Sequence, residues 1–196
     1  RDSGMDALTH AIESYITPGA WVMSDMFELK AIEMIAQNLK AAVDNGKDVA
    51  AREAMSQAQY IAGMGFSNVG LGIVHSMAHP LGAFYDTPHG VANALLLPYV
   101  MEYNAESPAA PKYIHIAKAM GVDTTGMSEA EGVKAAVEAV KALSASINIP
   151  QKLHEINVKE EDIPALAVAA FNDVCTGGNP RPTSVADIEA LYRKAF

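Results

Sequence analysis

The chain has 196 residues and a formal net charge of −9, with 50% hydrophobic and 19% charged residues. A chain of this size and composition can bury a core and need not be disordered. The acidic balance argues against a nucleic-acid or anionic-membrane partner, which needs a basic surface. The sequence contains no run of 18 or more apolar residues, the length that a membrane-spanning helix needs. The single cysteine, Cys175, excludes a disulfide within the chain, so we expect a cytoplasmic protein.

Helical periodicity runs through most of the chain, and no alternating strand pattern accompanies it. In the first half we expect helices over 4–16, 24–43, 48–69, 71–81 and 91–103, with a loop over 82–90. Further helices follow up to residue 195. The pattern therefore predicts an all-α fold, a bundle of about eight helices.

Local signals refine the helix ends. Pro98 is expected to kink the helix over 91–103 or to split off its last turn. Ser128 followed by Glu131 is typical of a capping box at a helix start. The segment from Thr176 to Pro180 is predicted to be a loop.

Histidines and one aspartate form a candidate set. His75 and His79 are four residues apart and share a helix face, and His89 follows after a short span. Asp6 and His10 are likewise four residues apart in the first expected helix, among apolar neighbours. An isolated carboxylate in such surroundings is costly unless it is paired or bound to a metal.

A carboxylate with several imidazoles suits Fe(II), Zn(II) or a similar divalent ion, whereas a cysteine-rich zinc site is excluded. A surface or core pair is the simpler reading of each helical pair and stays open. His115 and His154 are interpreted as ordinary residues of amphipathic segments. Glu13 is interpreted as a solvent-facing charge, with a hydrogen bond to the His10 ring as the alternative.

Two long motifs carry a family resemblance. The sequence GLGIVHSMAHPLGAFYDTPHG over 70–90 resembles the histidine signature of iron-containing (group III) alcohol dehydrogenases, and GMDALTHAIE over 4–13 resembles an earlier metal motif of that family. The likeness continues to Asp187 and Tyr192. Pro80, directly after His79, and the sequence DVCTGGNPR from residue 173 are most similar to members that interconvert propane-1,2-diol and lactaldehyde.

The resemblance implies the C-terminal helical domain of a dehydroquinate synthase-like fold and a defined site within it. Asp6, His10, His75 and His89 would be the four ligands of one Fe²⁺, which Zn²⁺ can replace in purified protein. His79 would not be a ligand. It would lie beside substrate and nicotinamide, as the catalytic residue that relays a proton.

Three further positions follow from the resemblance. Phe66 and Cys175 match positions that line the substrate pocket in similar proteins, with plain core packing and an inert buried thiol as the alternatives. Asp86 stands where similar proteins usually carry asparagine, and its effect on activity stays open.

The implied activity is the NAD(H)-dependent interconversion of a small primary alcohol or diol and its aldehyde. Similar enzymes are often homodimers, and the oligomeric state of this chain stays open. No glycine-rich dinucleotide-binding turn opens a helix in this sequence. The chain also starts on Arg1 without an initiator methionine. We therefore expect residues 1–196 to be a single metal-binding domain that lacks the N-terminal NAD-binding α/β domain.

Two functions of other classes stay open. The chain is alternatively an inactive helical scaffold or oligomerisation fragment that still binds metal. A metal hydrolase or ferritin-like di-iron protein is the third hypothesis, against which the sequence lacks paired Glu-x-x-His motifs.

Overall fold

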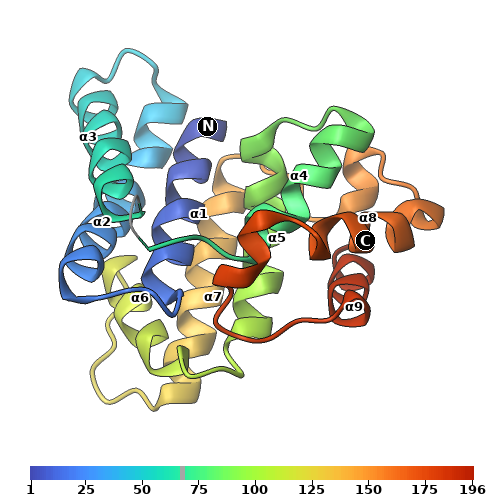
Figure 1. Cartoon of the computed structure of the whole chain (residues 1–196). Helices are drawn as coiled ribbons and strands as arrows, with labels where there is room; N and C mark the ends of the chain where they lie inside the picture. Colours follow the sequence, from blue (N-terminus) through green and yellow to red (C-terminus); the bar gives the residue numbers. More distant parts are fainter. Residues whose placement is uncertain (67–68) are drawn as a thin grey trace.

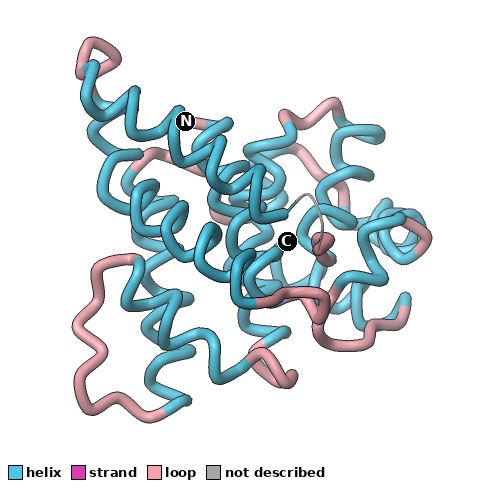
Figure 2. The backbone as a smooth tube through the Cα atoms, turned by 60° about the vertical axis from the view of Figure 1, so that its left-hand side comes forward, coloured by secondary structure: helices cyan, strands magenta, loops and turns pink. Residues whose placement is uncertain are grey.

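The computed structural model describes residues 1–66 and 69–196, without the side chain of Phe66. Within this part, nine α-helices are joined by loops and short 3-10 turns, and no strand occurs (Figures 1 and 2). The predicted all-α fold is therefore confirmed. None of the described helices is long and apolar enough to cross a membrane.

The α-helices, in chain order, are α1 (Asp2–Ile16), α2 (Val22–Asp44), α3 (Val49–Phe66), α4 (Ile73–Tyr85), α5 (His89–Asn104), α6 (Tyr113–Ala119), α7 (Glu129–Ser146), α8 (Ile163–Phe171) and α9 (Val185–Ala195). The 3-10 turns are η1 (Ala110–Lys112), η2 (Leu153–Ile156), η3 (Glu160–Asp162) and η4 (Val174–Gly178).

Helices α1 and α5 form the centre of the bundle. Helix α1 packs against α2, α3 and α5, and α5 packs in turn against α4, α7 and α9 (Figure 1). Their apolar faces are fully buried, for example at Leu8 and Ile12 in α1 and at Leu96 in α5. This packing brings α1 and α4, which are far apart in the sequence, to two sides of the start of α5.

The helix after Pro80 differs from the prediction. Helix α4 continues through Pro80 to Tyr85, so residues 82–85 are helical rather than part of the expected loop. An internal proline removes one helical hydrogen bond, but Met77 and Leu81 on either side of it are completely buried. We infer that tertiary packing outweighs the local cost and that the helix ends only at Asp86, which adopts the left-handed conformation (φ 56°).

Other local expectations have mixed outcomes. The capping box of Ser128 and Glu131 is confirmed by both reciprocal hydrogen bonds at the start of α7. Pro98 lies inside α5, which continues without interruption to Asn104, so the last turn is not split off. The expected loop over 176–180 begins inside the 3-10 turn η4, which Asp173 caps through the backbone N–H of Cys175.

A buried carboxyl group between α2 and α3 was not anticipated. Glu28 is completely buried, and neither of its carboxyl oxygens has a hydrogen-bond partner in the described part of the chain. It fills the space over Gly65, where a Cβ atom would overlap the carboxyl group. Burial, with a smaller contribution from the charge of Asp25, raises the pKa of Glu28 to about 9.

The raised pKa predicts a specific pH dependence. The folded state keeps the Glu28 proton up to about pH 9, whereas the unfolded chain loses it near pH 4.5, so stability falls as the pH rises between these values. Glu28→Gln removes this loss. We expect the variant to be more stable than wild type by about 3–5 kcal/mol at pH 8 and nearly equal at pH 4.5, measured by urea unfolding.

The matched control is Glu53→Gln, which neutralises an exposed carboxylate on α3. It should leave the pH dependence unchanged. A Glu28→Gln variant whose stability follows the wild-type pH profile would contradict the prediction.

Candidate metal centre

Three helices supply the candidate ligands. Asp6 and His10 lie one turn apart on α1, His75 lies in the first turn of α4, and His89 is the first residue of α5. Gly90, the next residue, permits this meeting, because a Cβ atom there would overlap the backbone oxygen of Asp2. The start of α5 therefore approaches the start of α1 closely enough to place His89 beside Asp6.

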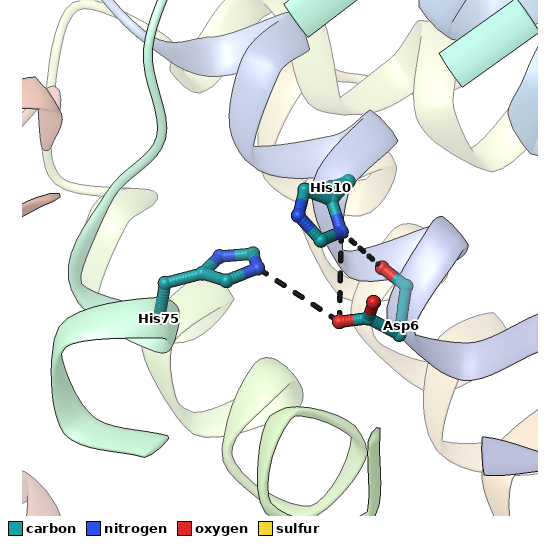
Figure 3. Close-up of side chains that lie close together, drawn as sticks. All are labelled: Asp6, His10 and His75. Carbon is teal, nitrogen blue, oxygen red and sulfur yellow. Dashed lines mark hydrogen bonds and ion pairs between the residues drawn. The ribbon is translucent and has the colours of Figure 1, made fainter. Parts of the chain in front are cut away.

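The carboxylate of Asp6 is the common neighbour of three imidazoles. Its Oδ1 lies 3.2 Å from Nε2 of His89, 3.5 Å from Nδ1 of His10 and 3.9 Å from Nε2 of His75. Figure 3 shows the rings of His10 and His75 turned towards this carboxylate. The ring centroids of His10 and His75 are 4.3 Å apart, and those of His75 and His89 are 5.6 Å apart.

This donor set fits a divalent ion. Asp6, His10 and His75 each offer one ligand atom, and these atoms all lie within 4.8 Å of one another. His89 adds a third imidazole on the open side, with its side chain 44% exposed. One carboxylate with three imidazole nitrogens provides the ligand number and chemistry that Fe(II) and Zn(II) accept.

The electrostatics of the cluster favour cation binding. Burial alone would raise the pKa of Asp6, but the hydrogen bond with His89 and the proximity of His10 hold it below its ordinary value. Burial, reinforced by His75, lowers the pKa of His10. The hydrogen bond to Asp6 raises the pKa of His89. Asp6 and His10 are thus biased towards their metal-binding forms, whereas the raised pKa of His89 opposes the loss of the proton that metal binding requires.

Asn93 belongs to the cluster and was missed in the sequence. Its side-chain Nδ2 donates to Asp6 Oδ1 at 2.6 Å and lies 3.1 Å from Nε2 of His89 and 3.5 Å from Nε2 of His75. The residue is fully buried, and its Oδ1 has no hydrogen-bond partner in the described part of the chain. Its position four residues after His89 was the available signal, because that spacing places both on one helix face.

His79 lies at the exposed edge of the cluster, one turn after His75. Its ring stacks on that of His89 with the centroids 5.5 Å apart. Its Nδ1 lies 2.7 Å from Oδ2 of Asp173, and the side chain is 43% exposed. An ionised carboxylate only accepts hydrogen bonds, so Nδ1 of His79 is the donor and Nε2 stays available. Asp173, like Asn93, was not singled out in the sequence.

The predicted pocket residues have different outcomes. Cys175 is partly buried beside Asp173, whose Oδ1 accepts its backbone N–H at 2.8 Å. Burial and then the charge of Asp173 raise the pKa of this thiol to about 11, so it is protonated at neutral pH. The side chain of Phe66 lies outside the described part of the chain. Whether either residue lines a pocket stays a prediction.

The remaining polar residues confirm one interpretation and correct another. His115 and His154 are both exposed, as expected of ordinary surface histidines. Asp86 is also exposed and ends α4. Glu13 is not a solvent-facing charge. It is 3% exposed, and its carboxylate accepts a close hydrogen bond from Nδ1 of His75.

The fold and this cluster define a class of protein, namely an all-helical domain with a carboxylate and imidazole centre suited to a divalent ion. Comparison with known proteins narrows the class. Residues 1–196 match the C-terminal part of the Fe-containing alcohol dehydrogenase family. The chain therefore belongs to this family, as the motifs over 4–13 and 70–90 predicted.

Individual relatives agree with this assignment. The chain is 59% identical over 194 residues to lactaldehyde reductase of Escherichia coli K12, and 46% identical over 194 residues to 1,3-propanediol dehydrogenase of Citrobacter freundii. Each comparison covers 99% of this chain and 50% of the relative, so the chain spans about half the length of these curated relatives. The crystal structure of a 1,3-propanediol oxidoreductase matches with a TM-score of 0.97 and 46% identity, over 100% of this chain and 51% of that chain.

The geometry predicts a stoichiometric metal site. After loading with Fe(II) under anaerobic conditions, or with Zn(II), and then dialysis, we expect about one ion per chain, measured by inductively coupled plasma mass spectrometry. Asp6→Ala and His75→Ala should each abolish retention, because each removes one ligand of the cluster.

His115→Ala is the control, since it removes an exposed histidine outside the cluster. Thermal melts would show that the variants are folded. Retention of the ion by folded Asp6→Ala and His75→Ala proteins would exclude this cluster as the site.

Proposed function

We propose that this chain is the metal-binding catalytic half of an NAD-dependent oxidoreductase that interconverts a small primary alcohol or diol and its aldehyde. The observation that carries the proposal is the convergence of Asp6, His10, His75 and His89 from three helices, with His79 stacked at the open edge. Relatives with alcohol or lactaldehyde oxidoreductase names support the reaction class.

The proposed ion is Fe²⁺, in keeping with the family, and Zn²⁺ is a competitor for the same ligands in purified protein. When bound, the ion supplies Lewis acidity to the oxygen of the substrate. Asp6, His10, His75 and His89 would hold it. The exposure of His89 and His79 leaves one side of the cluster open to a small ligand.

His79 is the residue that we expect to handle the proton. Because the Nδ1–H group of His79 donates its hydrogen bond to Asp173, Nε2 is the ring atom that would exchange a proton with the hydroxyl group of a substrate at the open edge. A nicotinamide, when bound, would supply the hydride chemistry, and His79 would be its neighbour. His79 is accordingly the proposed catalytic residue and also a neighbour of the cofactor.

The proposed substrate pair is propane-1,2-diol and lactaldehyde, or a similar short-chain pair. The support is the 59% identity to lactaldehyde reductase of Escherichia coli K12. Cys175 and Phe66 are the proposed pocket residues. Because the Cys175 thiol is protonated, it would contribute shape and polarity rather than act as a nucleophile.

We expect NAD(H) binding to involve residues beyond those of this chain. The relatives are about twice as long, and the sequence here contains no glycine-rich dinucleotide-binding turn. We propose that residues 1–196 form one domain, that a separate N-terminal half supplies most of the nucleotide site, and that the complete enzyme is a homodimer. The isolated chain would then bind metal but turn over no substrate.

The experiment joins this chain to the N-terminal half of the Escherichia coli lactaldehyde reductase and measures NAD⁺-linked oxidation of propane-1,2-diol after Fe(II) loading. We expect activity from the joined protein and none from the isolated chain. His79→Ala should lower kcat by roughly 10²-fold or more without releasing the metal, because general acid–base catalysis contributes on that scale. Asp6→Ala should lose both metal and activity.

His115→Ala serves again as the control and should retain full activity. A joined protein that is folded, metal-loaded and able to bind NAD⁺, yet oxidises no short-chain alcohol, would favour the inactive scaffold. Unchanged kcat in His79→Ala would remove His79 from the catalytic role.

A further inference from the structure

Glu13 is a buried acid that the proposed chemistry does not use. It lies on α1, three residues after His10, yet it reaches across to the start of α4. Its Oε2 accepts the backbone N–H of Val74 at 2.9 Å, and its Oε1 accepts the backbone N–H of His75 at 3.4 Å. Oε1 is also the acceptor for the ring Nδ1 of His75.

These contacts replace a missing helix cap. The N-cap residue of α4 is Gly72, which has no side chain to satisfy the first backbone N–H groups of the helix. The carboxylate of Glu13 accepts hydrogen bonds from the backbone N–H groups of Val74 and His75. The backbone N–H of Ile73 donates to Oδ1 of Asn179 at 3.4 Å. A Cβ atom at residue 72 would lie 2.6 Å from Oε2 of Glu13, so the absence of a side chain there makes room for the carboxylate.

The same carboxylate fixes the His75 ring. An ionised carboxylate has only acceptor atoms, so a hydrogen bond between Glu13 and Nδ1 requires that Nδ1 carries the proton. The neutral imidazole then has its lone pair on Nε2, which lies 3.9 Å from Asp6 Oδ1 on the side of the cluster. Metal-binding histidines commonly have such a carboxylate behind them, which orients the ring and sets the tautomer.

We propose that Glu13 is a positioning residue of the metal centre, which holds the backbone and the ring of His75 together so that Nε2 faces the ion. The proposal rests on the proposed function in so far as the ion binds at the cluster. Glu13 itself is not a ligand in this account. Both of its oxygens face α4, and its side chain is 2% exposed.

Asn93 and Glu13 therefore act on opposite sides of one ligand. Glu13 lies behind His75 at Nδ1, whereas the amide of Asn93 lies 3.5 Å from Nε2, in front of it. A displaced His75 ring would lose its contacts with both Glu13 and Asn93. Metal affinity should therefore depend on Glu13 even though Glu13 does not touch the ion.

Glu13→Gln is the sharpest variant, because it keeps the size of the side chain but offers one acceptor oxygen and one donor amide in place of two acceptors. The amide has to face either the N–H of Val74 or the Nδ1 side of His75. The control is Asn179→Ala, which removes the acceptor at Ile73 in the same helix end and leaves His75 untouched. Both variants should lower the unfolding midpoint, so stability alone does not separate them.

Two measurements distinguish Glu13→Gln from Asn179→Ala. In the metal-free chain, ¹⁵N NMR of the imidazoles should show His75 protonated at Nδ1 in wild type and Asn179→Ala, and a mixed or Nε2-protonated ring in Glu13→Gln. Titration with Zn(II) against a competing chelator should show a metal Kd about 10–100-fold weaker in Glu13→Gln than in wild type. Asn179→Ala should stay close to wild type.

The proposal is overturned if a folded Glu13→Gln chain keeps both the His75 tautomer and the wild-type Kd, or if Asn179→Ala weakens metal binding to the same extent. Failure of the proposed metal site would give a different pair of results. Wild type would then bind no metal at the cluster, while the tautomer measurement would still report whether Glu13 sets the His75 ring.

Discussion

The half-buried carboxylate of Asp6, enclosed by imidazoles from three helices, is the constraint on which the arrangement of the bundle depends. Its negative charge is partly removed from solvent, which is unfavourable unless cationic or donor groups surround it. His10 comes from the same helix, but His75 and His89 come from other helices. Compensation of this charge therefore requires α1, α4 and α5 to meet at one point.

Two packing contacts hold α1, α4 and α5 together at this point. Gly90 allows the start of α5 to approach α1, and Glu13 on α1 completes the start of α4. Each contact lies within two turns of a candidate ligand, so the elements that hold the helices together also set the positions of the rings. Rigid helices, rather than loops, carry the cluster, and this favours a preorganised site.

Exposure differs strongly between the histidines of the cluster. His75 is 2% exposed at its side chain, whereas His79 and His89 are more than 40% exposed. The buried side contains the groups that orient the ligands, and the open side contains the histidine that we propose for proton transfer. The Asp173 carboxylate reaches that side from η4, so the C-terminal part of the chain contributes to the site although it contains no proposed metal ligand.

Much of this was accessible from the sequence. The i, i+4 spacing of Asp6 with His10, and of His75 with His79, gives shared helix faces directly, and the long motifs gave the family. The sequence could not show that Glu13 faces α4, because the periodicity of a single helix does not reveal which neighbour covers it. Asn93 and Asp173 were missed for a related reason. Asp173 opens a motif that indicated the subfamily, but only the structure shows that its carboxylate contacts His79, and only the structure shows that the Asn93 amide contacts Asp6.

Pro80 shows a different limit. The helix was predicted to end at residue 81, just after Pro80, yet the buried faces at Met77 and Leu81 accompany a helix that continues to Tyr85. Glu28 is similar, because a glutamate within an amphipathic helix is ordinarily exposed and only the tertiary packing against Gly65 buries it. Local propensity was overridden in both places by contacts that are distant in the sequence.

The most direct test of the central claim is the position and coordination of the ion in crystals of the zinc-loaded chain, by anomalous diffraction at the metal edge. The account predicts one peak between Asp6, His10, His75 and His89, with ligand distances of about 2.0–2.2 Å to one carboxylate oxygen and three imidazole nitrogens. A peak elsewhere on the chain, or coordination that omits Asp6 or His75, would contradict it.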